Sequence, residues 1–222
     1  MNSKKSSPMK YLVLITLAVV ILLAMIVVLT NKSKDTDQTL ESHPPTANQP
    51  MIGKKDAPAS VVEFGDFKCP ACKAWGEMIY PQLKADFIDT GKANFTYINT
   101  EFHGKESTLS ALAAESILKN DPGSYWEFHK KLFEEQPADN HDALWITVDK
   151  LVEVAKKTTD IEADQFRQDI EQQTYMEEVN VDSSLVQDFN IQKTPTIIIN
   201  GTMLEDPYDY EKIKALIEEG QE

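Results

Sequence analysis

The sequence predicts an α/β protein in which a mixed sheet flanked by helices is interrupted by a helical insertion. Three observations lead to this fold class: a strand–helix–strand pattern, then a long stretch with helical periodicity alone, then a strand–turn–strand–helix pattern. An apolar segment precedes them. We therefore divide the chain into a tail (1–10), an apolar segment (11–30), a linker (31–50), two parts of one α/β domain (51–104 and 190–222) and an all-helical insertion (105–189).

The apolar segment is long enough to cross a membrane. Residues 11–29 contain Thr16 as their only clear polar residue, and 19 helical residues span about 28 Å, close to the roughly 30 Å of a hydrocarbon core. Three lysines precede it, which places residues 1–10 in the cytoplasm by the positive-inside rule. A cleaved signal peptide is the alternative, but its apolar stretch is normally about 7–15 residues and ends at a small-residue site. We expect an uncleaved, single-pass transmembrane anchor with the folded domain outside the cytoplasm.

The charge of the exported part excludes some partners. The whole chain carries a formal charge of −14, and without the three lysines of the first thirty residues the remainder carries −17. Such an acidic surface argues against nucleic acid or anionic lipid as a partner. It is compatible with a structural calcium ion, although no calcium-binding loop motif marks a position for one.

Residues 31–102 contain the linker and the first strand–helix–strand pattern. Residues 31–50 are polar, contain three prolines and lack a hydrophobic period, so we expect a flexible tether. Met51–Ile52 predicts a short strand, and the β-branched and aromatic run from Ser60 to Gly65 predicts a buried one. Apolar residues then recur every three or four positions from Trp75 to Phe87, which indicates an amphipathic helix that Pro81 should kink. The next strand is expected from 93 to 102.

Hydrophobic periodicity and turn motifs also predict the elements of the second half of the chain. Successive apolar stripes predict four or five helices in the insertion, the last of them carrying Val181, Leu185 and Phe189 on its buried face. His129 and Trp126 are interpreted as core or cap residues rather than ligands. Residues 196–199 then predict a strand, Asn200-Gly201 a two-residue hairpin turn, and 209–219 a final helix.

The only two cysteines, Cys69 and Cys72, lie where the first long strand gives way to a helix. Pro70 suits the first helical position, so Cys69 becomes the N-cap. Its sulfur then faces free backbone N–H groups and the positive end of the helix dipole, which favours the thiolate. Lowering a cysteine pKa from about 8.5 to about 5 requires about 5 kcal/mol. The dipole supplies about 0.3–1 kcal/mol, so hydrogen bonds from the Ala71 and Cys72 amides must add much of the rest.

Two other uses of a C-x-x-C pair are less favoured. A zinc site needs a second pair of ligands, and the chain has no further cysteine and no histidines at ligand spacing. A purely structural disulfide gains little from closing so short a loop. A redox-active disulfide between Cys69 and Cys72 remains the main hypothesis, and we expect no bound metal at this pair.

These residues resemble the thioredoxin-fold disulfide oxidoreductases of the DsbA type. The resemblance covers about residues 51–219 and rests on the segment from Glu63 to Cys72 and on Thr194-Pro195-Thr196, with a helical insertion between the two halves. With its N-terminal anchor the chain looks most like the membrane-tethered members of Gram-positive bacteria.

The resemblance implies roles for particular residues. Cys69 would be the exposed sulfur that exchanges with substrate, and Cys72 the shielded sulfur that resolves the mixed disulfide. Thr194-Pro195 would form a cis peptide bond beside the dithiol and present backbone groups to an extended substrate; an ordinary trans proline is the alternative. Glu63 would be a buried acid that moves the Cys72 proton, with an exposed glutamate at a strand end as the alternative.

Two departures from the family pattern concern redox tuning. The family reference has histidine between the proline and the second cysteine, whereas Ala71 offers no charge or donor beside Pro70, which could weaken oxidising power. Thr194 before the proline also occurs in disulfide isomerases, which dimerise through a domain absent from this sequence, and it could broaden substrate handling.

The predicted function is that of a membrane-anchored, extracytoplasmic thiol:disulfide oxidase. It would accept unfolded exported proteins with free thiols, require no cofactor besides its own disulfide, and be re-oxidised by a DsbB-like, quinone-reducing membrane partner, as the resemblance implies. A reductase or isomerase on the same fold is the nearest alternative. A tethered copper-binding module, using Cys69 and Cys72 with Met78 as the only near additional ligand, is an alternative of another class.

Overall fold

The computed structural model describes residues 8–32, 36–140 and 143–220. The chain divides into two compact units, Met1–Gln38 and Thr39–Glu222. The first contains helix α1 (Pro8–Lys32), which covers the predicted apolar segment 11–30. Of the predicted tail 1–10, residues 1–7 lie outside the described residues. Across the described ranges, no helix is both long and apolar enough to span a membrane.

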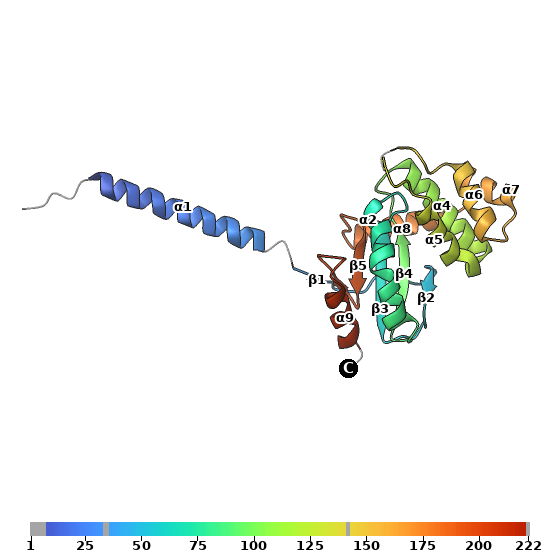
Figure 1. Ribbon diagram of the computed structural model, residues 1–222, viewed down its shortest axis with the longest axis horizontal. Coiled ribbons are helices and arrows are strands. Elements are labelled where there is room, and N and C mark those ends of the chain that lie inside the picture. Colours follow the sequence, from blue (N-terminus) through green and yellow to red (C-terminus); the bar gives the residue numbers. More distant parts are fainter. Residues whose placement is uncertain (1–7, 33–35, 141–142, 221–222) are drawn as a thin grey trace, which may run out of the picture. The chain divides into compact units, whose positions relative to one another are not determined.

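The second unit is built on a six-stranded mixed sheet of order β1-β6-β5-β3-β4-β2 (Figure 1). Its strands are β1 (Gln38–Thr39), β2 (Met51–Ile52), β3 (Ala59–Gly65), β4 (Ala93–Asn99), β5 (Thr196–Ile199) and β6 (Thr202–Met203). The central β3 pairs with β4 in parallel and with β5 antiparallel, and β2 pairs antiparallel with β4. The predicted α/β fold with a mixed sheet is therefore confirmed.

Helices α4 to α8 follow β4 and precede β5, which confirms the helical insertion. The helices of the second unit are α2 (Pro70–Met78), α3 (Tyr80–Leu83), η1 (Lys84–Ile88), α4 (Lys105–Asn120), η2 (Pro122–Ser124), α5 (Tyr125–Glu134), α6 (Val148–Thr158), α7 (Ala163–Glu171), α8 (Met176–Asp188) and α9 (Tyr210–Glu219). Figure 1 shows α4 to α7 grouped together beside the sheet, apart from α2 and α9.

Both faces of β3 are buried, and they belong to different cores. Val61 packs in the larger core with residues of α2, α5 and α9, whereas Val62 and Phe64 pack in a smaller core with Leu185 of α8. Because side chains alternate along a strand, Glu63 shares the face of Val61. The strand period therefore directs Glu63 to the α2 side, where the cysteines lie.

The predicted kink at Pro81 is present, and the helix is irregular over several residues around it. The α-helix ends at Met78, a single turn follows as α3, and η1 continues as a π-helix over Lys84–Ile88. Pro81 has no N–H to donate and its ring crowds the carbonyl four residues back, which interrupts the α-helical ladder.

The prediction of a flexible linker at 31–50 is wrong for its second half, because residues 39–50 pack on the sheet. The Leu40 N–H donates to the Gly201 carbonyl at 2.8 Å, His43 Nε2 lies 2.9 Å from Ser60 Oγ, and Gln49 Nε2 donates to Asp182 Oδ1 at 2.6 Å. Pro44 and Pro50 are buried. The polar composition of the segment gave no sign of partners so distant in sequence. We call residues 39–50 the N-terminal arm.

The buried face of α8 also differs from the prediction. Val181 is 52% exposed, whereas Asp182 on the next position is 1% exposed. Asp182 is buried because it accepts hydrogen bonds from the arm and from the backbone and side chain of Asn99. Apolar periodicity predicted the helix but not its buried face, because that face contains a hydrogen-bonded carboxylate, Asp182, in place of an apolar residue.

Candidate active site

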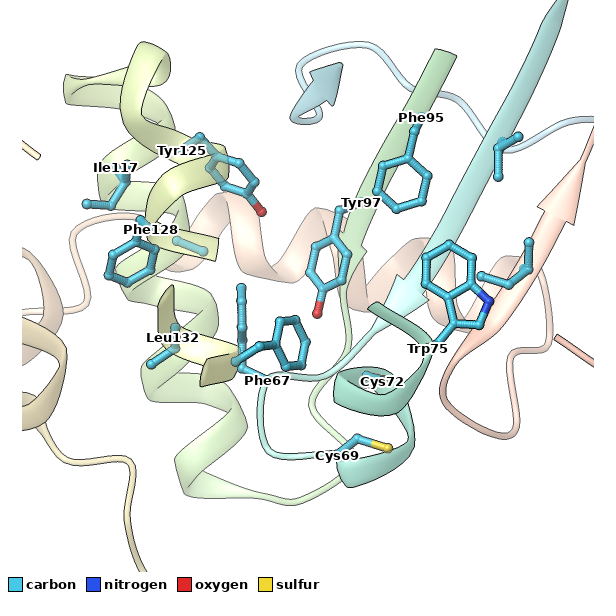
Figure 2. Packing of buried hydrophobic residues seen from close by; sticks show 14 of the residues in the cluster. Phe67, Cys69, Cys72, Trp75, Phe95, Tyr97, Ile117, Tyr125, Phe128 and Leu132 are labelled. Atoms are coloured by element: carbon cyan, nitrogen blue, oxygen red, sulfur yellow. The ribbon is translucent and has the colours of Figure 1, made fainter. Parts of the chain in front are cut away.

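The dithiol lies at the junction of β3 and α2, where the sequence pattern placed it. Cys69 is the N-cap residue, with φ −75° and ψ 119°, and Pro70 occupies the first helical turn. Figure 2 shows both cysteines at the start of α2, with Trp75 about one turn further on. Both thiols are free, and Cys69 is the more accessible at 6% exposed against 1% for Cys72. Cys69, predicted to be exposed, is thus largely buried but remains the sulfur that solvent reaches.

The site favours the Cys69 thiolate. A hydrogen bond from the Cys72 thiol is the largest influence. Together with the Thr194 side chain and the backbone N–H groups of Cys72 and Ala71 it outweighs burial and lowers the pKa of Cys69 to about 5. The two predicted amide donors are therefore present. The neighbouring Cys72 thiol, which was not among the predicted donors, contributes more than either of them.

Glu63 and Cys72 form a buried acidic pair behind Cys69. Glu63 is 3% exposed, which excludes the alternative of an exposed strand-end glutamate. Burial, together with the charge of Cys69, raises the pKa of Glu63 well above its usual value. Burial, the hydrogen bond to Cys69 and the charge of Glu63 raise the pKa of Cys72. Both groups therefore hold protons while Cys69 is ionised.

The loop before β5 faces the dithiol from the other half of the chain. The Thr194-Pro195 peptide bond is cis, so the trans alternative is excluded. The Cys69 thiol lies 3.5 Å from the Thr194 carbonyl oxygen, to which it donates. The structure thus brings together the two motifs, 125 residues apart, on which the resemblance rests.

Ala71 and Pro70 act through the backbone. Pro70 leaves the first helical position without an N–H, and the Ala71 N–H is aimed at the Cys69 sulfur. The Ala71 carbonyl accepts a hydrogen bond of 2.7 Å from the Tyr208 hydroxyl. Tyr208 was not predicted as a site residue, and its place before the final helix gave no sign that it reaches the C-x-x-C turn.

Asp66 is a second site residue that the sequence analysis missed. It is 1% exposed, and its carboxylate accepts hydrogen bonds from the Lys68 and Phe102 N–H groups and the Ser107 hydroxyl, and contacts His103 Nδ1 at 2.7 Å. The Asp66 N–H points at Cys72 Sγ, 3.5 Å away. Asp66 thereby fixes the loop that carries both cysteines.

Lys68, directly before Cys69, ties this loop to the helical insertion. Its ammonium group lies 2.7 Å from Glu106 Oε1 and donates to the Ala143 carbonyl at 2.5 Å. The other oxygen of Glu106 accepts the N–H groups of Trp145 and Ile146. The position of Lys68 in a turn of the sequence gave no indication that it would form a buried ion pair with Glu106.

The copper-binding alternative concerns Cys69, Cys72 and Met78. Among the residues that the structure describes, no group of three or more histidine, cysteine, aspartate or glutamate side chains is arranged to hold a metal ion. Met78, the additional ligand that a copper module would need, is 60% exposed on α2.

The site defines a thiol:disulfide oxidoreductase of the thioredoxin fold. It combines a dithiol at a helix N-terminus, an ionised outer cysteine, a buried acid and a cis-proline loop that faces the dithiol.

Comparison with known proteins supports this class. A family model described as Thioredoxin matches residues 45–219. Disulfide bond formation protein D of Bacillus subtilis is 43% identical over 188 residues, which cover 85% of this chain and 84% of that protein. A probable disulfide bond formation protein D of Bacillus cereus is 36% identical over 214 residues, covering 93% and 96%.

Solved structures give the same result. The crystal structure of oxidised BdbD from Bacillus subtilis superposes with a TM-score of 0.79 at 44% identity, covering 82% of this chain and 98% of that one. Chlamydia trachomatis DsbA, at 23% identity, shares the fold with a TM-score of 0.70 and coverage of 82% and 96%. The chain belongs to the BdbD-like, thioredoxin-fold disulfide bond formation proteins.

Proposed function

We propose that the protein is an oxidase that introduces disulfide bonds into exported proteins. The observation that carries this direction is the position of Cys69 at the N-terminus of α2, where the Cys72 thiol and the Ala71 and Cys72 N–H groups stabilise its thiolate and lower its pKa to about 5. Whatever stabilises the reduced thiolate also makes the disulfide more oxidising. The names of the relatives, which describe disulfide bond formation, support the same direction.

The reaction starts from the Cys69–Cys72 disulfide. A substrate thiolate attacks Cys69 Sγ, the bond to Cys72 breaks, and a mixed disulfide forms between substrate and Cys69. Cys72 leaves as a thiolate and takes a proton, which Glu63 is placed to supply because its raised pKa keeps it protonated. A second substrate thiolate then attacks the substrate sulfur of the mixed disulfide. The products are an oxidised substrate and a dithiol enzyme with Cys69 ionised.

Substrate binding at the cis-proline loop is part of this proposal. Thr194 and Pro195 flank Cys69, so an extended peptide could pair with the backbone of Thr194 while its cysteine meets Cys69. Such pairing depends on main-chain groups, which suits an enzyme that acts on many unfolded chains.

We also propose the cellular setting on sequence grounds. Residues 11–30 would anchor the protein to the cell membrane with the dithiol outside the cytoplasm. Two electrons must leave the dithiol for another turnover, and a DsbB-like, quinone-reducing membrane protein would accept them. A shared membrane would raise the effective concentration of the two partners.

We further propose that the acidic cluster between α4, α8 and the arm would be the place of a structural calcium ion, should the protein bind one. Glu115 and Asp182 are both buried, and burial raises their pKa values to about 8 and about 6. The amide nitrogens of Gln49 and Asn99 donate to these carboxylates, and their amide oxygens are buried without hydrogen-bond partners. If both amides rotated by half a turn, two carboxylates and two amide oxygens would face one another, and these are ligands that Ca²⁺ prefers. Thermal melts with Ca²⁺ and with a chelator test this, and equal melting temperatures would contradict it.

The reduction potential of the full-length protein, equilibrated in glutathione buffers, tests the direction of the reaction. We expect a value near the roughly −120 mV of a strong oxidant. A value near the roughly −270 mV of thioredoxin would instead identify a reductase. The Ala71→His variant is the matched comparison, because it restores the residue of the family reference without altering Cys69 or Cys72.

A further inference from the structure

A cavity of about 700 Å³ is lined by residues of β2, β3, β4, α2, α3, η1 and α5. Cys72 and Glu63 form part of its lining, whereas Cys69 does not. Its volume falls within the roughly 300–1,000 Å³ of small-molecule sites. We propose that this cavity binds an organic ammonium ion carried on an apolar or aromatic body.

The walls of the cavity are a continuous set of aromatic rings. Phe95 is central, with its ring centroid 5.8 Å from Trp75, 5.1 Å from Tyr80 and 5.6 Å from Trp126. The series continues from Trp126 to His129 at 5.3 Å and from His129 to Phe133 at 5.0 Å. Figure 2 shows the Trp75 and Phe95 rings side by side. Faces of Trp, Tyr and Phe attract cations through their quadrupoles, so these walls suit a cation as well as an apolar group.

Two polar groups of the lining have no partner in the protein. His129 Nε2 is buried without a hydrogen bond. Glu63 is 3% exposed and, among the residues that the structure describes, its carboxyl group forms no hydrogen bond or ion pair. Buried polar groups are normally satisfied, so an acid and an imidazole left open toward an aromatic cavity indicate a ligand with a hydrogen-bond donor.

The charges at the cavity favour a positive ligand. Its three lysines are already engaged: Lys73 donates to the Gln136 carbonyl, Lys84 pairs with Asp89 and Lys130 pairs with Glu134. Of the four glutamates in the lining, Glu134 has lysine partners, whereas Glu77 and Glu127 form no ion pair within the described part of the chain and are exposed. Glu63 holds its proton while no ligand is bound, and a cation beside it would favour its ionised form. The two exposed carboxylates outnumber the single lysine that is unpaired in this part of the chain, Lys73, so a cation is favoured over an anion at this cavity.

Binding of 2-phenylethylamine to the full-length reduced protein tests this inference, with 2-phenylethanol as the neutral probe of similar shape. Two of the three tryptophans, Trp75 and Trp126, line the cavity, so intrinsic fluorescence reports occupancy. We expect saturable binding of the amine and at least about tenfold weaker binding of the alcohol. Equal affinities, or no saturable binding of the amine, would overturn the proposal.

Gly76 provides a matched pair of variants. It lines the cavity on α2, and a Cβ added there meets no atom within 4 Å. Gly76→Leu should therefore project into the cavity without disturbing the fold and weaken amine binding by about tenfold or more, whereas Gly76→Ala should leave it within about twofold. Unchanged binding in Gly76→Leu would place the amine elsewhere and contradict the proposal. Binding is measured without thiol exchange, so a failed ligand test and a failed oxidase test remain distinguishable.

Discussion

At the scale of single residues, Cys72 determines the reactivity of Cys69 as much as the helix end does. The Cys72 thiol is the largest influence on the Cys69 pKa, ahead of the backbone N–H groups. Cys72→Ser keeps a hydroxyl donor, so we expect Cys69 to titrate near or below pH 6 in that variant. Cys72→Ala removes the donor and should raise the Cys69 pKa. Ultraviolet thiolate absorbance against pH measures both, and identical titrations would show that the backbone alone is responsible.

Glu63 is expected to assist proton transfer while it lowers the stability of the fold at neutral and alkaline pH. The pKa of Glu63 is higher in the folded than in the unfolded protein, so the folded protein becomes less stable as pH rises above the unfolded pKa of this acid. Glu63→Gln should therefore be more stable than the parent at pH 8, with a smaller difference at pH 4, in denaturant unfolding. The same variant should slow exchange at the dithiol about a hundredfold, as is typical for loss of a general acid. A variant that is neither more stable nor slower would remove Glu63 from the mechanism.

At the scale of elements, the Lys68–Glu106 ion pair joins the C-x-x-C loop to the helical insertion. Lys68 is 5% exposed and the Glu106 side chain 12% exposed, so Lys68→Met leaves a partly buried carboxylate without its cation and should cost at most about 3–5 kcal/mol of unfolding free energy. Adding Glu106→Gln should recover part of this loss, because the amide oxygen can still accept the Trp145 and Ile146 N–H groups.

The control for this pair is Lys131→Met on the exposed face of α5. Lys131 pairs with Glu134 at 3.1 Å in a solvent-exposed position, where such pairs contribute about 1 kcal/mol or less. If denaturant unfolding gave similar losses for Lys68→Met and Lys131→Met, the buried pair would not connect the two elements.

The N-terminal arm is the second element with a testable role. A chain that starts at Thr39 should retain full stability, whereas one that starts at Met51 loses the arm's hydrogen bonds to Gly201, Asp182 and the Tyr97 N–H. At about 0.5–1.5 kcal/mol each, these bonds predict a loss of about 2–4 kcal/mol. Equal midpoints in urea for the two chains would restore the interpretation of 39–50 as a tether.

At the scale of the whole molecule, the redox state should control stability in a pH-dependent way. Cys69 has a folded pKa of about 5 against a reference of 9.0, so its contribution is fully present above about pH 9 and is lost as pH falls toward 5. At pH 7 this contribution to the dithiol form is at most about 3 kcal/mol, because solvent screens part of the interaction at the helix end. The disulfide form has no thiolate and lacks this contribution, so it should melt at a lower temperature, by up to roughly 6–12 °C.

Thermal melts of both forms between pH 4 and pH 8 check this expectation. The difference between the two melting temperatures should shrink on acidification. A disulfide form that is the more stable at neutral pH would contradict both this linkage and the oxidase direction.

The sequence by itself determined the parts of this protein that depend on neighbouring residues. Period-two and period-3.6 patterns located β3, β4 and most helices; Pro70 placed Cys69 at the N-cap; and Asn200-Gly201 set the β5–β6 turn, where both residues have positive φ. Thiolate chemistry at Cys69 followed from the same local geometry.

The tertiary structure alone decided what depends on residues far apart in the chain. It placed Thr194 against Cys69, Tyr208 against Ala71, and Gln49 against Asp182, and so ordered the arm and buried Asp182 rather than Val181. Hydrophobic periodicity reports which face of an element is buried but not which polar group will meet it there. Such contacts exist only once the sheet has brought β3, β4 and β5 together, because each is formed between segments that share no local pattern.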